Sequence, residues 1–377
     1  MSNNRREFIK GSLLGGAAIA AASVPGVTAA TEHKKSHKVL DILVLGGTGF
    51  IGPHMVREAL RRGHSVTLFN RGRTNNALFP DLETIKGDRG GDLTMLEGRK
   101  WDAVIDNSGY VPRHVQNSAA TLSKNVGQYL YISTISVYDS LSAPTDEDAK
   151  LATIEDESVE EVTGATYGPL KALCEKRAQS EVDADRLTIL RPTYIAGPGD
   201  HTDRFSYWAV RASKGGEMLL PGGADYPLQV IDVRDLANFT IDCLGNHQAG
   251  IYNTVTPVGS MTIGSVLDDS LAVSASTVEP VWVDEAFAVE AEKDNTVRNW
   301  GMLPIWHALS GDDAAASSVS GQRARAAGLH NRPIRETIRD LLTWWDTLPE
   351  ERTATMRAGM TPEQEAELIA AWKTRNA

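Results

Sequence analysis

The stretch Val39-Leu-Asp-Ile-Leu-Val-Leu-Gly-Gly-Thr-Gly-Phe-Ile-Gly52 decides the fold of this chain. An apolar run ends in glycines and a helical spacing of apolar residues follows at once, which predicts a buried parallel strand, a tight turn and a helix. Gly46, Gly49 and Gly52 are spaced three residues apart, as in turns that let a dinucleotide pyrophosphate approach the backbone and a helix N-terminus. The alternative is an ordinary strand–helix turn. The predicted cofactor-binding residues of this turn are Gly46, Thr48, Gly49, Phe50 and Ile51.

The composition excludes several classes of function. The chain has 377 residues, of which 41% are hydrophobic, and its net charge is −11. This length suits one large domain or two closely associated ones. The negative charge argues against nucleic acid or an anionic membrane as the main partner. Two cysteines, Cys174 and Cys243, cannot form a disulfide framework and are expected to be buried thiols. No zinc-ligand spacing is present, so we expect no metal site.

The first thirty residues have the three parts of an export signal: a basic start, a short apolar middle and a small-residue end. Arg5 and Arg6, with Phe8 and Lys10 after them, resemble a twin-arginine signal. We therefore expect residues 1–30 to be a signal peptide and residues 31–38 to be a solvated leader. A folded protein would then be exported to the periplasm or another extracytoplasmic space. The apolar stretch is short for a transmembrane helix, and a disordered basic tail is the alternative.

Alternating strand and helix patterns after residue 38 predict an α/β fold with a Rossmann-type, doubly wound parallel sheet. We assign residues 39–198 to the nucleotide-binding domain, with residues 229–255 returning to it. Residues 199–228 and 256–348 are assigned to a smaller α/β substrate-binding region on the C-terminal side. Residues 349–377 are assigned to a helical extension, because Thr361-Pro362 with Gln364 forms a capping box.

Asn70-Arg71-Gly72-Arg73 follows the second predicted strand, where NAD-selective folds carry an acidic residue for the ribose hydroxyls. Because an arginine attracts a 2′-phosphate, we predict NADP as cofactor, with NAD as the alternative, and Asn70 and Arg71 as ligands. The alternative for these arginines is a solvated turn. Asp88 ends the third predicted strand and is placed to accept from the adenine amino group. Ser108 ends the fourth, and its small side chain allows a cofactor to lie against the backbone.

Tyr167 and Lys171 lie four residues apart on a helix that we expect to run from Lys171 to Val182, with Tyr167-Gly-Pro-Leu-Lys171 opening it. Side chains at this spacing share one helical face, so both can reach one ligand. A Tyr-x-x-x-Lys pair alone is common. It indicates a site here because it follows a strand that ends in Ser133-Thr134.

Together these residues resemble the extended short-chain dehydrogenase/reductases, in particular the NAD(P)-dependent epimerase/dehydratase-like members. The resemblance covers about residues 39–250. Its matching segments run in the family's order: Gly46–Gly52, Ser133-Thr134 with Val137-Tyr138, Tyr167-x-x-x-Lys171, Leu190-Arg-Pro-Thr-Tyr-Ile-Ala-Gly-Pro198 and Val230-Ile-Asp-Val-Arg-Asp235.

The resemblance implies a catalytic triad of Thr134, Tyr167 and Lys171. Tyr167 would exchange a proton with a substrate oxygen while hydride moves to or from the nicotinamide. Because a free phenol has a pKa of about 10, we expect the Lys171 ammonium and an oxidised nicotinamide to lower the pKa of Tyr167. Lys171 would also bind the nicotinamide ribose, as a cofactor ligand. Thr134 would orient the substrate oxygen, with Ser133 as the fallback.

Two positions depart from the pattern of sugar-nucleotide enzymes. Tyr194 stands where those enzymes usually carry a diphosphate-binding Asn, and Leu228-Gln229 replaces an Arg-Asp pair. His201 and Arg204 offer substitutes that would suit an acidic or polyhydroxy substrate, unless they only cap and solvate a loop. The predicted substrate-binding residues are Ser133, Tyr194, His201 and Arg204.

We expect an enzyme acting at a carbinol carbon of a sugar or polyhydroxy compound, an epimerase or dehydratase that returns hydride to its substrate. The alternatives are an NADP-dependent reductase or dehydrogenase of a small carbonyl compound and a non-catalytic cofactor-binding protein. Some atypical members of the family bind RNA, but the acidic charge speaks against nucleic acid here. The expected partner is a small-molecule substrate, with neither nucleic acid nor membrane, and a homodimer is possible.

Overall fold

The computed structural model describes residues 38–293 and 301–377. The predicted signal peptide, residues 1–30, and nearly all of the predicted leader lie outside the described residues. The first half of the described chain alternates strands with helices. Its elements are β1 (Asp41–Leu45), α1 (Ile51–Arg61), β2 (Ser65–Asn70), β3 (Thr84–Lys86), η1 (Thr94–Leu96), β4 (Trp101–Asp106), α2 (Pro112–Leu122), β5 (Val126–Ile132), η2 (Ile135–Val137), α3 (Gly164–Glu181) and β6 (Leu187–Pro192).

The second half leaves the main sheet and returns to it once, at β10. Its elements are β7 (Tyr194–Ala196), α4 (Ser206–Ser213), β8 (Gly216–Pro221), β9 (Val230–Asp232), α5 (Val233–Gly245), β10 (Gly250–Thr254), α6 (Ile263–Ser274), β11 (Val278–Val283), α7 (Glu285–Lys293), α8 (Gln322–Ala326), α9 (Ile334–Trp345), α10 (Glu350–Thr353) and α11 (Pro362–Arg375).

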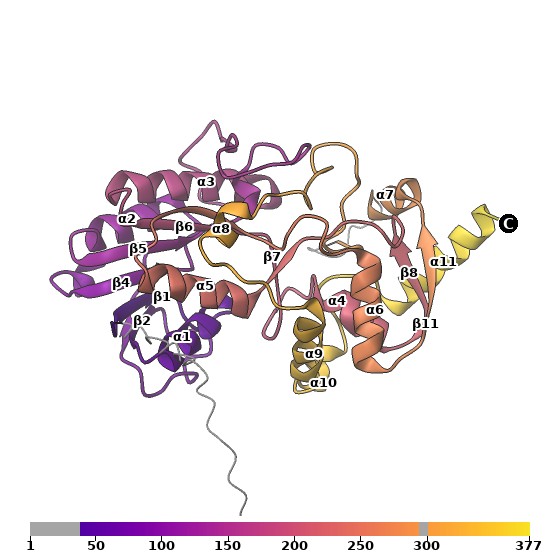
Figure 1. Ribbon diagram of the computed structural model, residues 1–377, viewed down its shortest axis with the longest axis horizontal. Helices are drawn as coiled ribbons and strands as arrows, with labels where there is room; N and C mark the ends of the chain where they lie inside the picture. The colour runs from indigo at the N-terminus through magenta and orange to yellow at the C-terminus, as the bar shows by residue number, and fades with distance from the viewer. Residues whose placement is uncertain (1–37, 294–300) are drawn as a thin grey trace, which may run out of the picture. The chain divides into compact units, whose positions relative to one another are not determined.

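Seven parallel strands form the central sheet in the order β10-β6-β5-β4-β1-β2-β3 (Figure 1). The chain proceeds outward from β1 to β3 on one side and from β4 to β10 on the other. The strand order therefore reverses between β1 and β4, and a doubly wound sheet opens a ligand crevice at that point, outside the carboxyl ends of the strands. The predicted α/β fold with a Rossmann-type parallel sheet is confirmed.

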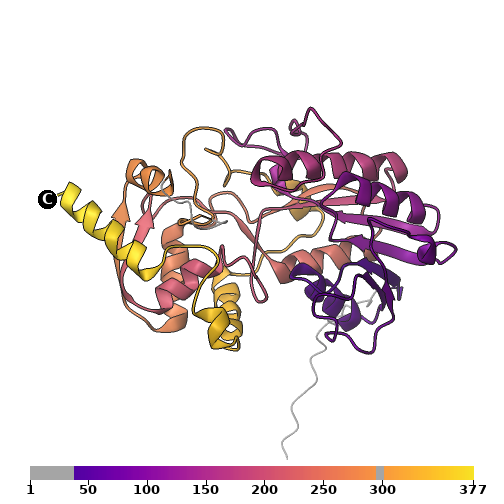
Figure 2. The same cartoon turned by 180° about the vertical axis from the view of Figure 1, so that it is seen from behind.

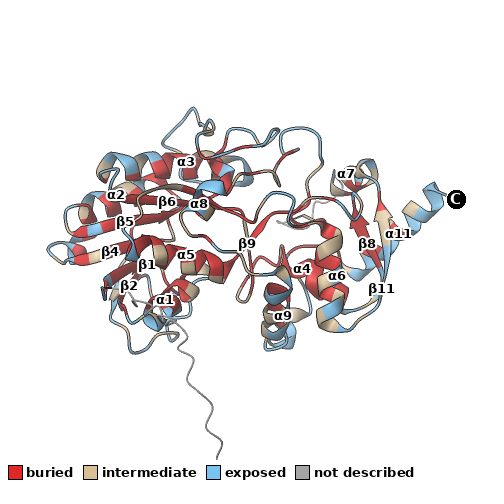
Figure 3. Cartoon of the chain, in the orientation of Figure 1, coloured by how far each residue is buried: buried red, intermediate tan, exposed pale blue. Residues whose placement is uncertain are grey.

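Each face of the sheet is covered by helices, α1 and α5 on one face and α2 and α3 on the other (Figures 1 and 2). β1 illustrates the reason. Ile42 and Val44 pack into the core beneath α1 and α5, whereas Leu43 and Leu45 pack into the core beneath α2 and α3. Successive side chains on a strand point to opposite faces, so a strand buried on both sides must be apolar throughout. Figure 3 shows these strands as buried along most of their length.

A separate core holds the substrate-side region together. The parallel pair β8–β11 packs with α4, α6 and α9. A second parallel pair, β7–β9, leads into this region from the main sheet. The C-terminal segment also joins this core. Glu365 of α11 accepts from Arg211 of α4 at 2.5 Å and from the Leu219 N–H of β8 at 3.0 Å.

One predicted boundary is wrong in an instructive way. Helix α3 begins at Gly164, not at Lys171, because Thr163 and Thr166 form a capping box. Pro169 therefore lies inside the helix rather than in a turn before it. Within the described residues, no helix is both long and apolar enough to traverse a bilayer.

Candidate active site

The glycine turn after β1 is built for close approach to a ligand. Gly46 and Gly47 have φ values of +109° and +88°, which disfavour any side chain. A Cβ on Gly52 would lie 2.5 Å from Gly47 Cα, so only glycine lets α1 begin this close to the turn. Within the described residues, no side chain caps the first turn of α1, and such N–H groups favour an anion.

The end of β4 faces this turn. A Cβ on Gly46 would lie 2.5 Å from Asn107 Oδ1. The Nδ2 atom of Asn107 is buried and has no hydrogen-bond partner among the described residues. Ser108 donates from Oγ to Leu45 O at 3.1 Å and so joins the ends of β4 and β1. A glycine cradle, an uncapped helix N-terminus and an orphaned amide together fit a dinucleotide at the crevice between β1 and β4.

The predicted selectivity residues surround the end of β2. Asn70 accepts from Gly72 N at 2.8 Å and lies 3.5 Å from Gly46 O, so it connects β2 to the glycine turn. Arg71 and Arg73 are exposed. Asp88 accepts from Gly90 N, which lowers the pKa of its carboxyl, and the charges of Arg71 and Arg73 lower that pKa further. The structure therefore brings both arginines near Asp88, the residue predicted to bind the adenine amino group.

Two buried ion pairs near the site went unnoticed in the sequence. Arg89 forms a bidentate pair with Asp106 at the end of β4, with both N–O distances at 2.5 Å. Tyr129 donates to the same carboxylate at 2.7 Å. Arg191 of β6 pairs with Glu175 of α3 at 3.0 and 2.6 Å and fixes this helix against the sheet. A charged residue directly after the apolar run Ala103–Ile105, namely Asp106, was the available signal.

Lys171 is buried at the carboxyl edge of the sheet. Its Nζ donates to Gly109 O at 2.8 Å and to Ile132 O at 2.7 Å, and it lies 4.3 Å from the centre of the Tyr131 ring. The two carbonyls end β5 and follow β4, so the ammonium connects neighbouring strand ends. Burial lowers the pKa of Lys171 to about 8, although the charge of Asp106 opposes this effect. An ammonium has three donors, and these two bonds use two of them.

Tyr167 lies on the same helix, one turn before Lys171, and hydrogen-bonds to Thr134. Thr134 is buried and its Oγ1 accepts from Ser136 N at 3.2 Å. Gly168 lets α3 pack close enough for Tyr167 to reach Thr134, because a Cβ at position 168 would lie 2.2 Å from Ser136 O. The fallback residue, Ser133, is buried, and its Oγ has no hydrogen-bond partner among the described residues. The predicted triad is thus brought together.

The expected effect of Lys171 on Tyr167 is wrong for this structure. Burial, with a smaller contribution from Tyr110, raises the pKa of Tyr167 to about 12, against the lowering effect of Thr134 and Arg204. The Lys171 ammonium is instead turned toward the carbonyls of Gly109 and Ile132. Tyr167 therefore carries its proton at neutral pH.

A pocket of about 410 Å³ lies in the substrate-side region. Two of the predicted substrate residues line it, Tyr194 and Arg204, whereas His201 does not. His201 is exposed and packs edge-on against Phe50, with the ring centres 6.2 Å apart. His307 also lines the pocket and was not among the predicted site residues, although the apolar loop Leu303–His307 is one that the sequence offers as a cover for the substrate. Its Nε2 lies 2.7 Å from the Tyr194 hydroxyl. The other lining residues are Glu292, Gly301, Leu303, Pro304, Ile305 and Trp306.

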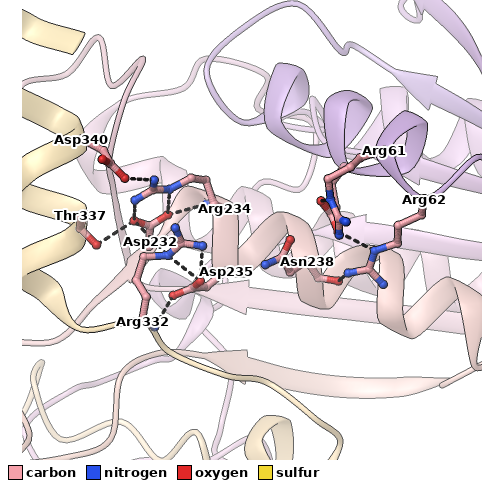
Figure 4. Close-up of polar contacts among 10 residues, drawn as sticks. Arg61, Arg62, Asp232, Arg234, Asp235, Asn238, Arg332, Thr337 and Asp340 are labelled. Carbon is pink, nitrogen blue, oxygen red and sulfur yellow. Dashed lines mark hydrogen bonds and ion pairs between the residues drawn. The ribbon is translucent and has the colours of Figure 1, made fainter. Parts of the chain in front are cut away.

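Polar contacts connect the nucleotide-binding half to helix α9 and the segment before it (Figure 4). Asp232 caps α5 by accepting from Arg234 N at 2.7 Å, and it also accepts from the Thr337 hydroxyl of α9 at 2.7 Å. Arg234 pairs with Asp340 of α9, and Arg332 pairs with Asp235 at 2.8 Å. The Val230–Asp235 motif is therefore structural here. No group of three or more His, Cys, Asp or Glu side chains in residues 38–293 and 301–377 could hold a metal ion.

Comparison with known proteins identifies the family. Residues 42–255 match the model of the NAD dependent epimerase/dehydratase family, which is more than half of the chain. The chain belongs to the NAD-dependent epimerase/dehydratase family. Its fold is also that of family structures. The chain matches the Bordetella bronchiseptica enzyme WbmH, solved with NAD+, at a TM-score of 0.61 and 17% identity, covering 82% of this chain and 99% of that one. The chain matches UDP-glucose 4-epimerase of Thermotoga maritima at a TM-score of 0.56 and 17% identity, covering 81% of this chain and 98% of that one.

Two curated relatives of this chain have names that describe different activities, one a binding protein and the other a reductase. A chloroplast stem-loop binding protein of 41 kDa from Arabidopsis thaliana is 28% identical over 253 residues, which is 60% of each chain. A 2-alkyl-3-oxoalkanoate reductase from Stenotrophomonas maltophilia is 30% identical over 222 residues, 53% of this chain and 64% of that protein. The chain thus spans about three fifths of the length of these relatives.

Proposed function

We propose that this protein is an NADP-dependent epimerase or dehydratase-like oxidoreductase that acts at a carbinol carbon of a sugar or polyhydroxy substrate, with NAD as the alternative cofactor. The observation that carries the proposal is the hydrogen-bonded pair Thr134–Tyr167 beside Lys171 at the carboxyl edge of the sheet. A nicotinamide cofactor, when bound, supplies hydride exchange at the carbinol carbon.

The residues of this chain would divide the remaining work. The glycine turn and the N–H groups of α1 would bind the pyrophosphate, and Arg71 would bind a 2′-phosphate. Lys171, held by two carbonyls, would direct its third donor to the ribose hydroxyls. Thr134 would orient the substrate oxygen, and Tyr167 would hold or release the proton at that oxygen.

Two observations favour a substrate without a nucleotide diphosphate. Gln229 is buried. Among residues 38–293 and 301–377, its side chain bonds only backbone groups, namely Thr256 O at 2.7 Å, Val319 O at 3.0 Å and Val319 N at 2.9 Å. Tyr194 is engaged with His307. The two positions at which related enzymes would bind a diphosphate are therefore occupied by internal contacts.

A second candidate is a reductase of a small carbonyl compound. It is favoured by the raised pKa of Tyr167, because a protonated phenol can donate to the oxygen of a carbonyl that is being reduced. The name of the Stenotrophomonas relative agrees with this candidate. We also propose, from residues 1–30 alone, export by the twin-arginine route. Scarce free NADP outside the cytoplasm would favour an enzyme that returns hydride to its own substrate.

The test compares wild type with Tyr167→Phe. Tyr252→Phe is the matched control, because in the described part of the chain that hydroxyl donates to Ala249 O alone. Turnover of a panel of sugars, uronates and hydroxy ketones is measured, together with the nucleotide retained by each protein. Tyr167→Phe should abolish turnover and still retain nucleotide. Unchanged turnover would remove Tyr167 from the mechanism. Stoichiometric consumption of added NADPH with a simple ketone would support the reductase instead.

A further inference from the structure

The pocket in the substrate-side region contains a second set of proton-carrying side chains. The Tyr194 hydroxyl lies 2.7 Å from His307 Nε2, and the two rings stack with their centres 6.0 Å apart. The other ring nitrogen, Nδ1, lies 3.9 Å from a carboxylate oxygen of Asp313. A hydroxyl hydrogen-bonded to a base that in turn faces a carboxylate is the arrangement by which enzymes activate a weak acid–base group.

The backbone that carries His307 is held firmly. The Tyr226 hydroxyl bonds both backbone groups of His307. It accepts from His307 N at 3.0 Å and donates to His307 O. Trp208 Nε1 donates to Pro304 O at 2.8 Å. Ile305 has a φ of +62°, which is uncommon for a β-branched residue. Such backbone strain persists where the surroundings enforce it, and here it fixes the direction of the following side chains.

Electrostatics relate this pair to Tyr167. The Arg204 guanidinium lies 5.0 Å from the centre of the Tyr194 ring. Its charge lowers the pKa of both Tyr194 and Tyr167, although burial raises each of them more. One guanidinium therefore acts on both phenols. Burial lowers the pKa of His307 against the opposing effect of Asp313, so the imidazole is a neutral base at neutral pH. Four apolar residues, Leu303–Trp306, also line the pocket and are buried, and Glu292 and Gly301 complete its lining.

We propose that Tyr194 and His307 form a second proton-transfer pair, which removes and returns a proton at the carbon next to a substrate carbonyl. The proposal rests on the proposed use of this pocket for a polyhydroxy carbonyl compound. The C–H bond breaks and its proton passes to the Tyr194 oxygen, while the Tyr194 hydroxyl proton passes to His307 Nε2. The C–H electron pair forms the C=C bond of an enediolate, whose oxygen carries the negative charge beside Arg204, which lines the same pocket. His307 becomes an imidazolium, so protons and charge balance.

After the enediolate turns over in the pocket, His307 returns its proton to Tyr194 and Tyr194 returns one to the other face of the carbon, which inverts that carbon without net oxidation or reduction. Arg204 would stabilise the negative charge that develops on the oxygen. The substrate class is therefore an α-hydroxy ketone, bound or formed in the pocket, and the result is inversion at the carbon next to the carbonyl carbon.

The experiment uses the full-length protein and L-erythrulose, an open-chain α-hydroxy ketone, in D2O. Deuterium at C3 and formation of D-erythrulose are followed by NMR and chiral chromatography, and the nicotinamide absorbance is recorded in parallel. Wild type should incorporate deuterium at C3. Tyr194→Phe and His307→Gln should each lose incorporation by about 100-fold, the lower range for general acid–base catalysis. Tyr252→Phe and His330→Gln, an exposed histidine, should exchange as wild type does.

Absence of exchange by wild type above the buffer rate, or undiminished exchange in both Tyr194→Phe and His307→Gln, would overturn the proposal. The nucleotide bound by the protein is read separately. A protein that exchanges deuterium but neither releases nor binds a nicotinamide dinucleotide would support this inference and contradict the proposed oxidoreductase function. Retention of the wild-type melting temperature by both variants separates a catalytic effect from misfolding.

Discussion

Replacement of Gly168 by alanine should displace Tyr167 from Thr134 and so test how the triad is assembled. Gly168 lies inside α3, and alanine in a helix interior is usually favoured over glycine by about 1 kcal/mol. Here the added Cβ would lie 2.2 Å from Ser136 O, whereas real Cβ contacts are not shorter than 3.0 Å. The helix and the Ser136 backbone would have to separate by about 0.8 Å in a closely packed interior.

Two consequences follow from that displacement. Overpacking costs about 1–3 kcal/mol, which should cancel or exceed the gain in helix propensity and lower the melting temperature. A misplacement of about 1 Å in a catalytic group can cost about 100-fold in rate, so turnover should fall by roughly that factor. The matched control is Gly164→Ala, at the first position of the same helix, where an added Cβ would meet nothing within 4 Å. The control should keep both activity and stability. Equal turnover by the two variants would refute this account of the triad.

Three further predictions concern the cofactor, the buried charge and the pH dependence. Arg71→Ala should weaken NADP binding by roughly tenfold or more and leave NAD binding unchanged, as measured by calorimetry, because a charged hydrogen bond is worth about 1.5–3 kcal/mol; equal losses for both nucleotides would contradict the selectivity argument. Asp106→Asn leaves the buried Arg89 charge without its carboxylate, which costs about 3–5 kcal/mol, so the melting temperature should fall by roughly 10 °C; an unchanged melting curve would show that the pair is dispensable. Activity that needs the Lys171 ammonium should decline as pH rises through about 8, because Lys171 is charged below this pKa and neutral above it. Tyr167, with a pKa of about 12, keeps its proton over the same range. Lys171→Arg should remove this decline from the pH profile of the rate.

The sequence predicted the parts of the fold that local patterns encode. The run from residue 39 to 52 specified β1, the glycine turn and α1, because apolar strands and helical spacing are short-range signals. The capping box of α11 was also readable, since Thr361 and Gln364 lie three residues apart. The start of α3 was not, because Pro169 resembles a turn signal, and the capping pair that overrides it consists of two ordinary threonines.

The site was only partly predictable, for a physical reason. Tyr167, Lys171 and Thr134 could be related by a helical spacing and a strand end, and they lie together. His307 lies 113 residues after Tyr194, and no local pattern relates a histidine in an apolar loop to a distant tyrosine. The pKa of Tyr167 likewise depends on burial and on the direction of the Lys171 ammonium. Sequence spacing gives neither.

The central claim is that a dinucleotide binds across the glycine turn, and it has a direct test. The purified full-length protein is denatured, and the released nucleotide is identified and quantified by mass spectrometry, with apoprotein then titrated with NADP+ and NAD+ by calorimetry. The account predicts a nicotinamide dinucleotide released in near-stoichiometric amount, or one binding site per chain on titration, with NADP+ preferred. A protein that releases no dinucleotide and binds neither one would contradict it.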